Sequence, residues 1–545
     1  MIQNPILPGF NSDPCLCRRG EDYYLAVSTF EWFPGIPVYH SRDLKHWELY
    51  THILNDAEAL GLRGLPSAKG LWAPCLTWCE ADGNFYLVYG IMRSMNARFF
   101  DIDNYLITAP EITGPWSEPV YLHSAGFDAS LLHDDDGRKW LVSLEWETRD
   151  DRQKPGGICL CEYDPNKKAI VGTPKRIYMG GTQRGCLEGP HLYRKNGWYY
   201  LLCAEGGTGY YHCATMARSR SVWGPYEPDP TNPILTSVPE NHDERADVDH
   251  LKPRYYNPEA PLQKAGHGSL VELPDGTPYM SFHCARPFVP ELCCTLGREA
   301  GLQRMEWTDD GWLRMPGGGN LVRQETEETG LPAFEPRLFP NHDDFDGDTL
   351  GIVYYAPRID PGTFADLNAR RGWLRLRGQQ SLSSLDRVSL VARKLTSLHA
   401  QITTRMAFRP EVYQHGTGLT LYYDNMNYIW LRKTWSEEMD MPVLSVMEVE
   451  RGVKRDHAPV PAPEGDVWLR LTIDGRVTRF SWSADSAAWH EIGPEFATWH
   501  LSDEYSRFGE FTGCMFGVVC VDAMRHSVCA DFDYLDYREG YANAE

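Results

Sequence analysis

Short runs that alternate between apolar and polar residues dominate the chain, and helix-period patterns are sparse. Such alternation is typical of half-buried β-strands. In the first half, five copies of one unit recur, each with a motif that ends in an aliphatic residue, a turn, and an aromatic alternating run. The copies are DPCLCRRGEDYYLAVS from Asp13, APCLTWCEADGNFYLVY from Ala73, DASLLHDDDGRKWLVS from Asp128, GPHLYRKNGWYYLLC from Gly189 and HGSLVELPDGTPYMSF from His267.

The spacing of these copies indicates the architecture of the first domain. Most of their turns carry Asp-Gly or Asn-Gly, which favour tight hairpins: Gly20, Asp82-Gly83, Asp136-Gly137, Asn196-Gly197 and Asp275-Gly276. The copies lie far enough apart for about four short strands each. Segments between them, SRDLKHWELY, TGPWSEPV and SVWGPYEP, repeat a Trp near a turn. We predict a five-bladed β-propeller over residues 1–325, with a β-sandwich of coincidental internal similarity as the alternative.

The pattern changes after about residue 325. Residues 326–340 lie within a stretch rich in Pro, Gly and acidic residues and are predicted to be a linker. Beyond it, alternating runs continue as GWLRLRG, SLVARKL, LTLYYDN, YIWLRKT, DVWLRLTI and TRFSWSA. These runs predict a second all-β domain at 341–545, a β-sandwich of the jelly-roll or concanavalin-like type.

Composition narrows the classes of function. Lys and Arg total 53 against 75 Asp and Glu, a formal charge of -22, which argues against nucleic acid or an anionic membrane as partner. The 15 cysteines show no C-x-x-C pair and no compact disulfide framework, which suits a reducing compartment. The start MIQNPILPGF has no signal-peptide pattern. We therefore expect a cytoplasmic protein.

The propeller would bring distant acids together. If the repeated motif opens the innermost strand of each blade, Asp13, Asp128 and His267 converge on the axis. Glu188 stands one residue before the equivalent position of its blade and should lie at the same rim. Three carboxyl groups in one pocket suit glycoside hydrolysis, in which one carboxylic acid protonates the leaving oxygen and a carboxylate activates water or attacks the sugar. The acid needs a raised pKa, from an apolar pocket or a neighbouring negative charge.

Several segments carry a resemblance to a known family. GFNSDPCL, STFEWFPGIPVYHSRDLKHW, LWAPCL, GFDASLLHD, CLEGPHLY and AEGGT resemble the signature segments of glycoside hydrolase family 43, in its β-xylosidase branch with a C-terminal domain. The similarity continues through KAGHGSLVE, ARPF, LGREAGLQRMEW, SLVARK and DFDYLDY, and so covers nearly the whole chain.

The resemblance implies roles for the acids. Asp13 matches the family's general base, Glu188 its general acid, and Asp128 the residue that raises the acid's pKa and orients it. It also implies inversion at the anomeric carbon, for which the base and acid stand about 6.5–9.5 Å apart, and the propeller-plus-sandwich fold.

Further candidate residues flank these segments. Arg286 in ARPF is expected to bind substrate hydroxyls, because a guanidinium is a rigid fork of donors. Phe30, Trp72 and Phe127 are expected to wall the sugar pocket, with core packing as the alternative, and Thr208 is a weaker candidate. His267 is either a core histidine or a functional one; in some relatives it ligates a divalent cation such as Ca²⁺, and no cofactor is otherwise expected.

A loop of the second domain should complete the pocket. Relatives of the β-xylosidase branch close it with a Phe-Thr-Gly loop, which RFGEFTG at 507–513 matches through Phe511. Phe508 and Glu510 interrupt the Gly-rich pattern of relatives, which affects the expected shape towards the leaving group.

The resulting prediction is an inverting exo-glycosidase that releases D-xylose from the non-reducing ends of β-1,4-xylo-oligosaccharides. Side activity on α-L-arabinofuranosides is expected. An α-L-arabinofuranosidase and a non-catalytic sugar-binding propeller are the alternatives. Relatives also suggest a homo-oligomer, a dimer or tetramer.

Overall fold

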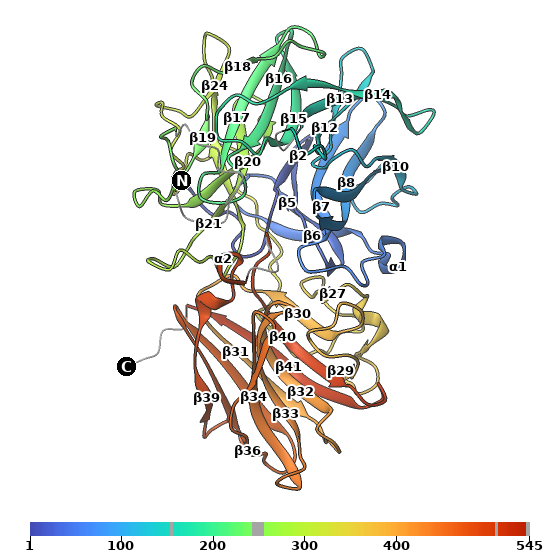
Figure 1. The fold of residues 1–545 in the computed structure, drawn as a ribbon, viewed down its shortest axis with the longest axis vertical. Coiled ribbons are helices and arrows are strands. Elements are labelled where there is room, and N and C mark those ends of the chain that lie inside the picture. Colours follow the sequence, from blue (N-terminus) through green and yellow to red (C-terminus); the bar gives the residue numbers. More distant parts are fainter. Residues whose placement is uncertain (153–155, 242–254, 507–510, 541–545) are drawn as a thin grey trace.

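The chain folds into two β domains, and the computed structural model describes residues 1–152, 156–241, 255–506 and 511–540. The first domain is a ring of five small sheets, drawn in blue through green to yellow-green, and the second is a two-sheet sandwich, drawn in yellow through orange to red (Figure 1). The predicted all-β fold, a five-bladed propeller followed by a concanavalin-like sandwich, is confirmed.

Each of the first four blades begins with a repeated motif, and its strands follow one another outwards from the axis. Blade one contains β2 (Cys15–Arg19), β3 (Asp22–Ala26), β5 (Gly35–Ser41) and β6 (Glu48–Leu54). Blade two contains β7 (Gly70–Cys79), β8 (Asn84–Asn96), β9 (Phe99–Ala109) and β10 (Val120–His123). Blade three contains β11 (Ser130–His133), β12 (Lys139–Glu145), β13 (Gly157–Asp164) and β14 (Ala169–Tyr178). Blade four contains β15 (Glu188–Lys195), β16 (Trp198–Glu205), β17 (Cys213–Ser219), β18 (Glu227–Pro228) and β19 (Leu235–Thr236).

Blade five closes the ring with help from the N-terminus. Its sheet contains β20 (Gln263–Glu272), β21 (Pro278–Ala285) and β22 (Glu299–Arg304), followed by the small β23–β24 pair (Glu306–Trp307 and Leu313–Arg314). The N-terminal segment runs beside it: Leu7 bridges Ala300 of β22, and β1 (Ile2–Gln3) pairs with β25 (Glu325–Thr326). The first and last parts of the propeller are thus joined by backbone hydrogen bonds.

The turns within the repeated hairpins fall at the predicted positions. Gly20, Gly83, Gly137, Gly197 and Gly276 all have positive φ, between 61° and 87°, where a side chain would be strained. The Trp-bearing segments each precede an outer strand, since Trp47, Trp116 and Trp223 lie just before β6, β10 and β18.

The second domain is a sandwich of two antiparallel sheets. One sheet has the order β28 (Ala365–Asp366), β29 (Leu374–Arg377), β41 (Cys529–Glu539), β31 (His399–Ala407), β37 (Val467–Asp474), β38 (Val477–Ser483), β39 (His490–Ala497), with β26 (His342–Asp343) beside β41. The other has the order β30 (Ser389–Lys394), β40 (Met515–Asp522), β32 (His415–Asp424), β33 (Asn427–Ser436), β34 (Met441–Glu450), β35 (Val453–Asp456), with β36 (Val460–Pro461) beside β34. All six runs predicted as strands in this half lie in these sheets.

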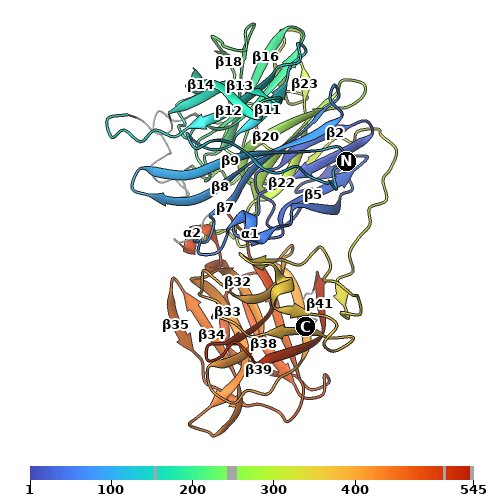
Figure 2. The same cartoon turned by 90° about the vertical axis from the view of Figure 1, so that its right-hand side faces the viewer.

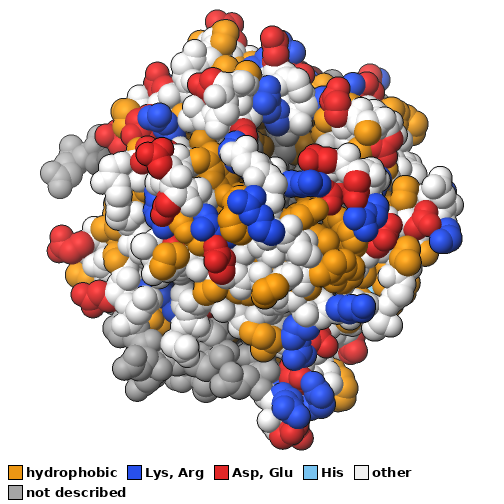
Figure 3. All heavy atoms as spheres, turned by 90° about the horizontal axis from the view of Figure 1, so that it is seen from above, with side chains coloured by type: hydrophobic (Ala, Val, Ile, Leu, Met, Phe, Trp, Pro, Cys, Tyr) orange, Lys and Arg blue, Asp and Glu red, His pale blue; other side chains and the backbone are white. Residues whose placement is uncertain are grey.

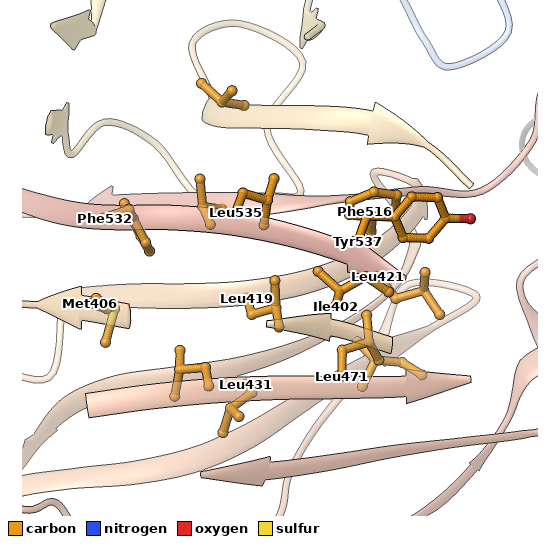
Figure 4. Close-up of a cluster of buried hydrophobic side chains, with 14 of the residues drawn as sticks. Ile402, Met406, Leu419, Leu421, Leu431, Leu471, Phe516, Phe532, Leu535 and Tyr537 are labelled. Carbon is orange, nitrogen blue, oxygen red and sulfur yellow. The ribbon is translucent and has the colours of Figure 1, made fainter. Parts of the chain in front are cut away.

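The core of the sandwich comes from the inward positions of its alternating strands. Ile402, Leu419, Leu431, Leu471 and Phe532 are all buried between the sheets (Figure 4). Burying a side chain of this size contributes about 1.5–3 kcal/mol, so the alternation seen in the sequence fixes which face of each strand points inwards.

The two domains meet over an extensive interface. No regular strand or helix lies between β25 and β26, where the linker is predicted, and this segment runs down the outside of the propeller (Figure 2). β4 (Trp32–Phe33) of the propeller pairs with β27 (Ala356–Pro357). Arg358 is buried there, and its Nε donates to the carbonyl of Leu65 at 2.7 Å.

Helices are few and short in the described ranges: α1 (Ala57–Leu60), α2 (Asp503–Ser506) and the 3₁₀ turns Pro361–Thr363 and Thr498–His500. None of these is long enough to cross a membrane. From above, basic and acidic side chains are interspersed with apolar ones over the propeller (Figure 3).

Candidate active site

The five repeated motifs place one residue each in a left-handed backbone conformation. Asp13, Ala73, Asp128, Gly189 and His267 have φ of 53°, 36°, 54°, 58° and 47°. Non-glycine residues seldom adopt this conformation, and strained backbone tends to gather at functional sites. The same local turn in every blade explains why the sequence motifs align, and it carries Asp13, Asp128 and His267 to one place.

A cavity of ≈ 190 Å³ lies above this ring. The structure brings nine of the ten predicted site residues to its wall: Asp13, Phe30, Trp72, Phe127, Asp128, Glu188, Thr208, His267 and Phe511. The pocket is smaller than the roughly 300–1,000 Å³ of pockets that take drug-sized ligands, so it matches a ligand of about one sugar ring.

Asp13 is fixed as an anion. Ser28 Oγ donates to its Oδ2 at 2.6 Å, and Arg298 Nη1 lies 3.5 Å from its Oδ1. The ring nitrogens of His283 and His267 lie 3.6 and 3.8 Å from the same oxygen. Burial alone would raise the pKa of Asp13, but the His283 contact and the charges of His267 and Arg298 outweigh it and hold the pKa well below its usual range.

Glu188, in contrast, is held in its protonated form. Burial raises the pKa of Glu188 well above its ordinary value, and the nearby charge of Asp128 raises it further, with a smaller contribution from Asp13. Burial also raises the pKa of Asp128, to about 6, although His267, Arg298 and a 2.9 Å hydrogen bond from the Gly189 N–H all favour its ionised form. Because Asp128 has these partners, we assign the proton of this pair to Glu188.

Aromatic rings from both domains surround the carboxyl groups. The ring of Phe511, from the sandwich, lies 5.6 Å from Trp72 and 6.2 Å from Phe30, and Trp72 lies 5.6 Å from Phe127. Ser12 Oγ holds the Phe511 segment by donating to its carbonyl at 2.7 Å. Phe508 and Glu510 lie outside the described residues.

Arg286 requires a correction. Its guanidinium donates two 2.7 Å hydrogen bonds to the buried carboxylate of Glu299 and is absent from the wall of the cavity. The arginine in the wall is Arg298, whose guanidinium carbon lies 4.4 Å from the centre of the Phe511 ring. Two of its nitrogens, Nε and Nη2, are buried without a hydrogen-bond partner, so Arg298 has donors free for a substrate hydroxyl.

Sequence reasoning also missed residues that support the site. Ser28 joins blades one and two, because its Oγ donates to Asp13 and accepts from the Ala73 N–H at 2.8 Å. Phe100 and Trp146 stack with ring centres 3.7 Å apart in the cavity wall. Phe100 comes from the β8–β9 hairpin, whose strands are unusually long. That length was the feature that could have pointed to Phe100.

His267 raises the question of a metal. Asp13, His267 and His283 offer donor atoms within 4.8 Å of one another. Two imidazoles and one carboxylate do not form the oxygen cage that Ca²⁺ prefers, and the guanidinium of Arg298 already lies against the same carboxylate. The described residues therefore do not fit a directly bound calcium ion.

The arrangement can perform paired acid–base chemistry. One carboxylate is ionised and one carboxylic acid is protonated in the same small cavity, and a third carboxylate stands next to the acid. This is the division of roles that hydrolysis of a glycosidic bond requires.

Comparisons with known proteins agree with this geometry. The model of glycosyl hydrolases family 43 matches residues 2–313, and that of the beta xylosidase C-terminal concanavalin A-like domain matches residues 342–538. A beta-xylosidase of Bacillus subtilis is 38% identical over 99% of both chains. A xylosidase/arabinosidase of Humicola insolens is 40% identical over 98% of this chain and 97% of its own. The crystal structure of a xylan beta-1,4-xylosidase from Bacillus halodurans superimposes with a TM-score of 0.93 at 43% identity, covering 99% of this chain and all of that one. The chain therefore belongs to glycosyl hydrolase family 43 and carries the C-terminal domain of the family's β-xylosidases.

Proposed function

We propose that the protein is an inverting exo-glycosidase that releases D-xylose from the non-reducing ends of β-1,4-xylo-oligosaccharides. The observation that carries the proposal is the difference in protonation between two carboxyl groups of the cavity: Asp13 is an anion and Glu188 is protonated. The names of the Bacillus relatives support xylosides as the substrate, and the size of the cavity supports the removal of one sugar at a time.

The reaction follows from the positions of these groups. Asp13 takes a proton from a water molecule as the water oxygen attacks the anomeric carbon. Glu188 gives its proton to the glycosidic oxygen as the bond between that oxygen and the anomeric carbon breaks. Water enters on the face opposite the leaving group, so a β-linked substrate yields α-xylose. Asp128 takes no part in bond breaking; it keeps Glu188 protonated until the leaving oxygen needs the proton.

An α-L-arabinofuranosidase is the second candidate. Arabinofuranose and xylopyranose present similar hydroxyls, and the Humicola relative is named for both activities. Rates on a chromogenic β-D-xyloside and a chromogenic α-L-arabinofuranoside, measured side by side, decide which is the main activity. Binding of both without turnover would instead show a sugar-binding propeller.

Replacement of the acid and the base tests the mechanism. Asp13→Ala and Glu188→Ala should each lower xylobiose hydrolysis by at least about 10²–10⁴-fold. With an activated leaving group, which needs little protonation, Glu188→Ala should keep far more activity than Asp13→Ala. If Glu188→Ala loses as much activity as Asp13→Ala on both substrates, the assignment of Glu188 as the general acid is wrong. Proton NMR should show α-xylose as the first product; β-xylose would indicate a covalent intermediate and retention.

We also place the enzyme in the cytoplasm and expect a dimer or tetramer. The 15 cysteines, all free and mostly buried, support a reducing compartment. Cell fractionation and light scattering of the purified protein test these two expectations.

A further inference from the structure

A second ring of side chains lies under the catalytic ring. Successive side chains on a strand alternate in direction, so residues two positions after the left-handed residues face the channel again. These residues are Cys15, Cys75, Ser130, His191 and Ser269.

The hydroxyls of the two serines in this ring form hydrogen bonds to the backbone. Ser130 Oγ donates to the carbonyl of Pro190 at 2.5 Å, and Ser269 Oγ accepts from the Leu16 N–H at 2.7 Å. The possible ligand atoms of the other three members lie close together: the two cysteine sulfurs and one imidazole nitrogen are all within 4.8 Å of one another.

These three residues are suited to holding a soft cation. Tetrahedral zinc with Zn–S bonds of about 2.3 Å and Zn–N bonds of about 2.0 Å sets donor atoms about 3.5–3.8 Å apart, so small shifts would close the set. Cys15 and Cys75 are buried, and the Leu76 N–H already donates to Cys15 Sγ at 3.3 Å. Such a hydrogen bond stabilises a thiolate, and thiolates select Zn²⁺ over Ca²⁺ or Mg²⁺.

An ion can reach this ring without passing the sugar pocket. A funnel of ≈ 540 Å³ is lined by Cys15, Cys75 and His191 and extends to the hairpin turns at Gly20 and Glu80. On the other side, a small cavity of ≈ 10 Å³ separates the ring from the active site and is shared by His191, Cys75, Asp128 and Asp13.

We propose that Cys15, Cys75 and His191 bind one Zn²⁺ ion, with solvent from the funnel as a fourth ligand. The ion would join blades one, two and four across the channel directly beneath the catalytic carboxyl groups. On binding, each thiol releases its proton to water, the ion loses part of its hydration shell, and no oxidation state changes. This site is distinct from the group of Asp13, His267 and His283.

Zinc titration of the full-length protein tests the site. Reduced protein, stripped with a chelator, should take up one Zn²⁺ per chain against a chromogenic indicator, and its thermal midpoint should rise. Cys15→Ser and Cys75→Ser should each abolish this uptake, and His191→Ala should weaken it more than about tenfold. Cys203→Ser, buried in blade four, and the exposed Cys529→Ser are controls and should bind as the wild type does.

Two outcomes would overturn the proposal: wild-type protein that takes up no stoichiometric zinc, or uptake that persists in both Cys15→Ser and Cys75→Ser. The latter would place the ion elsewhere, for instance at Asp13, His267 and His283. Because the serine variants could fold poorly, Cd²⁺ bound to the wild type provides a second readout. Two thiolates give an ultraviolet charge-transfer band, whereas a site of oxygen and nitrogen ligands gives none and would refute the proposal.

Discussion

Three carboxyl groups share one cavity, yet their surroundings put them in different protonation states. Asp13 meets Ser28, His283 and Arg298, which favour its anion. Glu188 is buried next to Asp128, which favours its acid form. The chemistry therefore depends on the neighbours of each acid, because the acids themselves are chemically similar.

The pH profile of Asp128→Asn tests its role. The basic limb of kcat/KM marks deprotonation of the general acid. Asparagine removes the charge of Asp128 at nearly constant size, so the pKa of Glu188 should fall and the basic limb should move to lower pH, with a large loss of rate at neutral pH. Burial still raises the pKa of Glu188, so the limb should remain above the range of an exposed glutamate. An unmoved limb would reduce Asp128 to a structural or substrate-binding residue.

Arg298→Ala should shift the profile in the opposite direction. The charge of Arg298 lowers the pKa values of Asp13 and Glu188. Without it, both limbs should move to higher pH, and KM should rise because substrate hydroxyls lose a donor. Arg286→Ala is the matched control. Because Arg286 lies outside the cavity, both limbs of the pH profile should stay in place in this variant. If the limbs move in Arg286→Ala and stay in place in Arg298→Ala, the arginine that acts on the carboxyl groups of the cavity is Arg286 and not Arg298.

At the scale of elements, the inner strands and one loop of the sandwich set the shape of the cavity. Gly297, just before β22, has a φ of +76°, and a Cβ there would lie 1.9 Å from the carbonyl oxygen of Thr512. This close approach seats the Phe511 segment against blade five, next to Arg298.

Gly297→Ala should therefore displace the Phe511 segment. A misplacement of about 1 Å at a catalytic site can cost about 10²-fold in rate, and we expect a loss of that order in kcat/KM. Gly276→Ala is the control, because its φ of +87° imposes a similar backbone strain while nothing lies within 4 Å of its added carbon. Similar losses in the two variants would show that strain alone is responsible.

The sequence predicted the strands, and the meeting of the three acids in one cavity, because both depend on the repeat. Each blade solves the same packing problem, so its hairpin, its turn glycine and its left-handed residue recur, and Asp13, Asp128 and Glu188 follow from their places in it. Arg298 lies directly before β22, the third strand of its blade, and outside the repeated motif. Whether Arg286 or Arg298 faces the cavity depends on which of them meets Glu299, and no local pattern in the sequence encodes that contact.

At the scale of the whole molecule, the site exists only when the domains are docked. Phe511 comes from the sandwich, and the interface holds a buried ion pair between Lys264 of blade five and Glu504 of α2. Glu504 also accepts from the Cys294 N–H at 2.9 Å. Burial alone would lower the pKa of Lys264, but electrostatic interactions with Cys294, Glu504 and Asp503 raise it, so the lysine keeps its charge in the interface.

Breaking this pair should loosen the docked state. Lys264→Met leaves the carboxylate of Glu504 buried beside Asp503 without its cation, which costs about 3–5 kcal/mol. The thermal midpoint and kcat/KM should therefore both fall, because α2 leads into the segment that carries Phe511. The double variant Lys264→Met/Glu504→Gln removes the unpaired charge and should recover much of the loss. Lys167→Met, which removes the exposed partner of Asp164, is the control and should change stability by at most about 1 kcal/mol. A double variant as unstable as the sum of its two single variants would show that the pair does not hold the domains together.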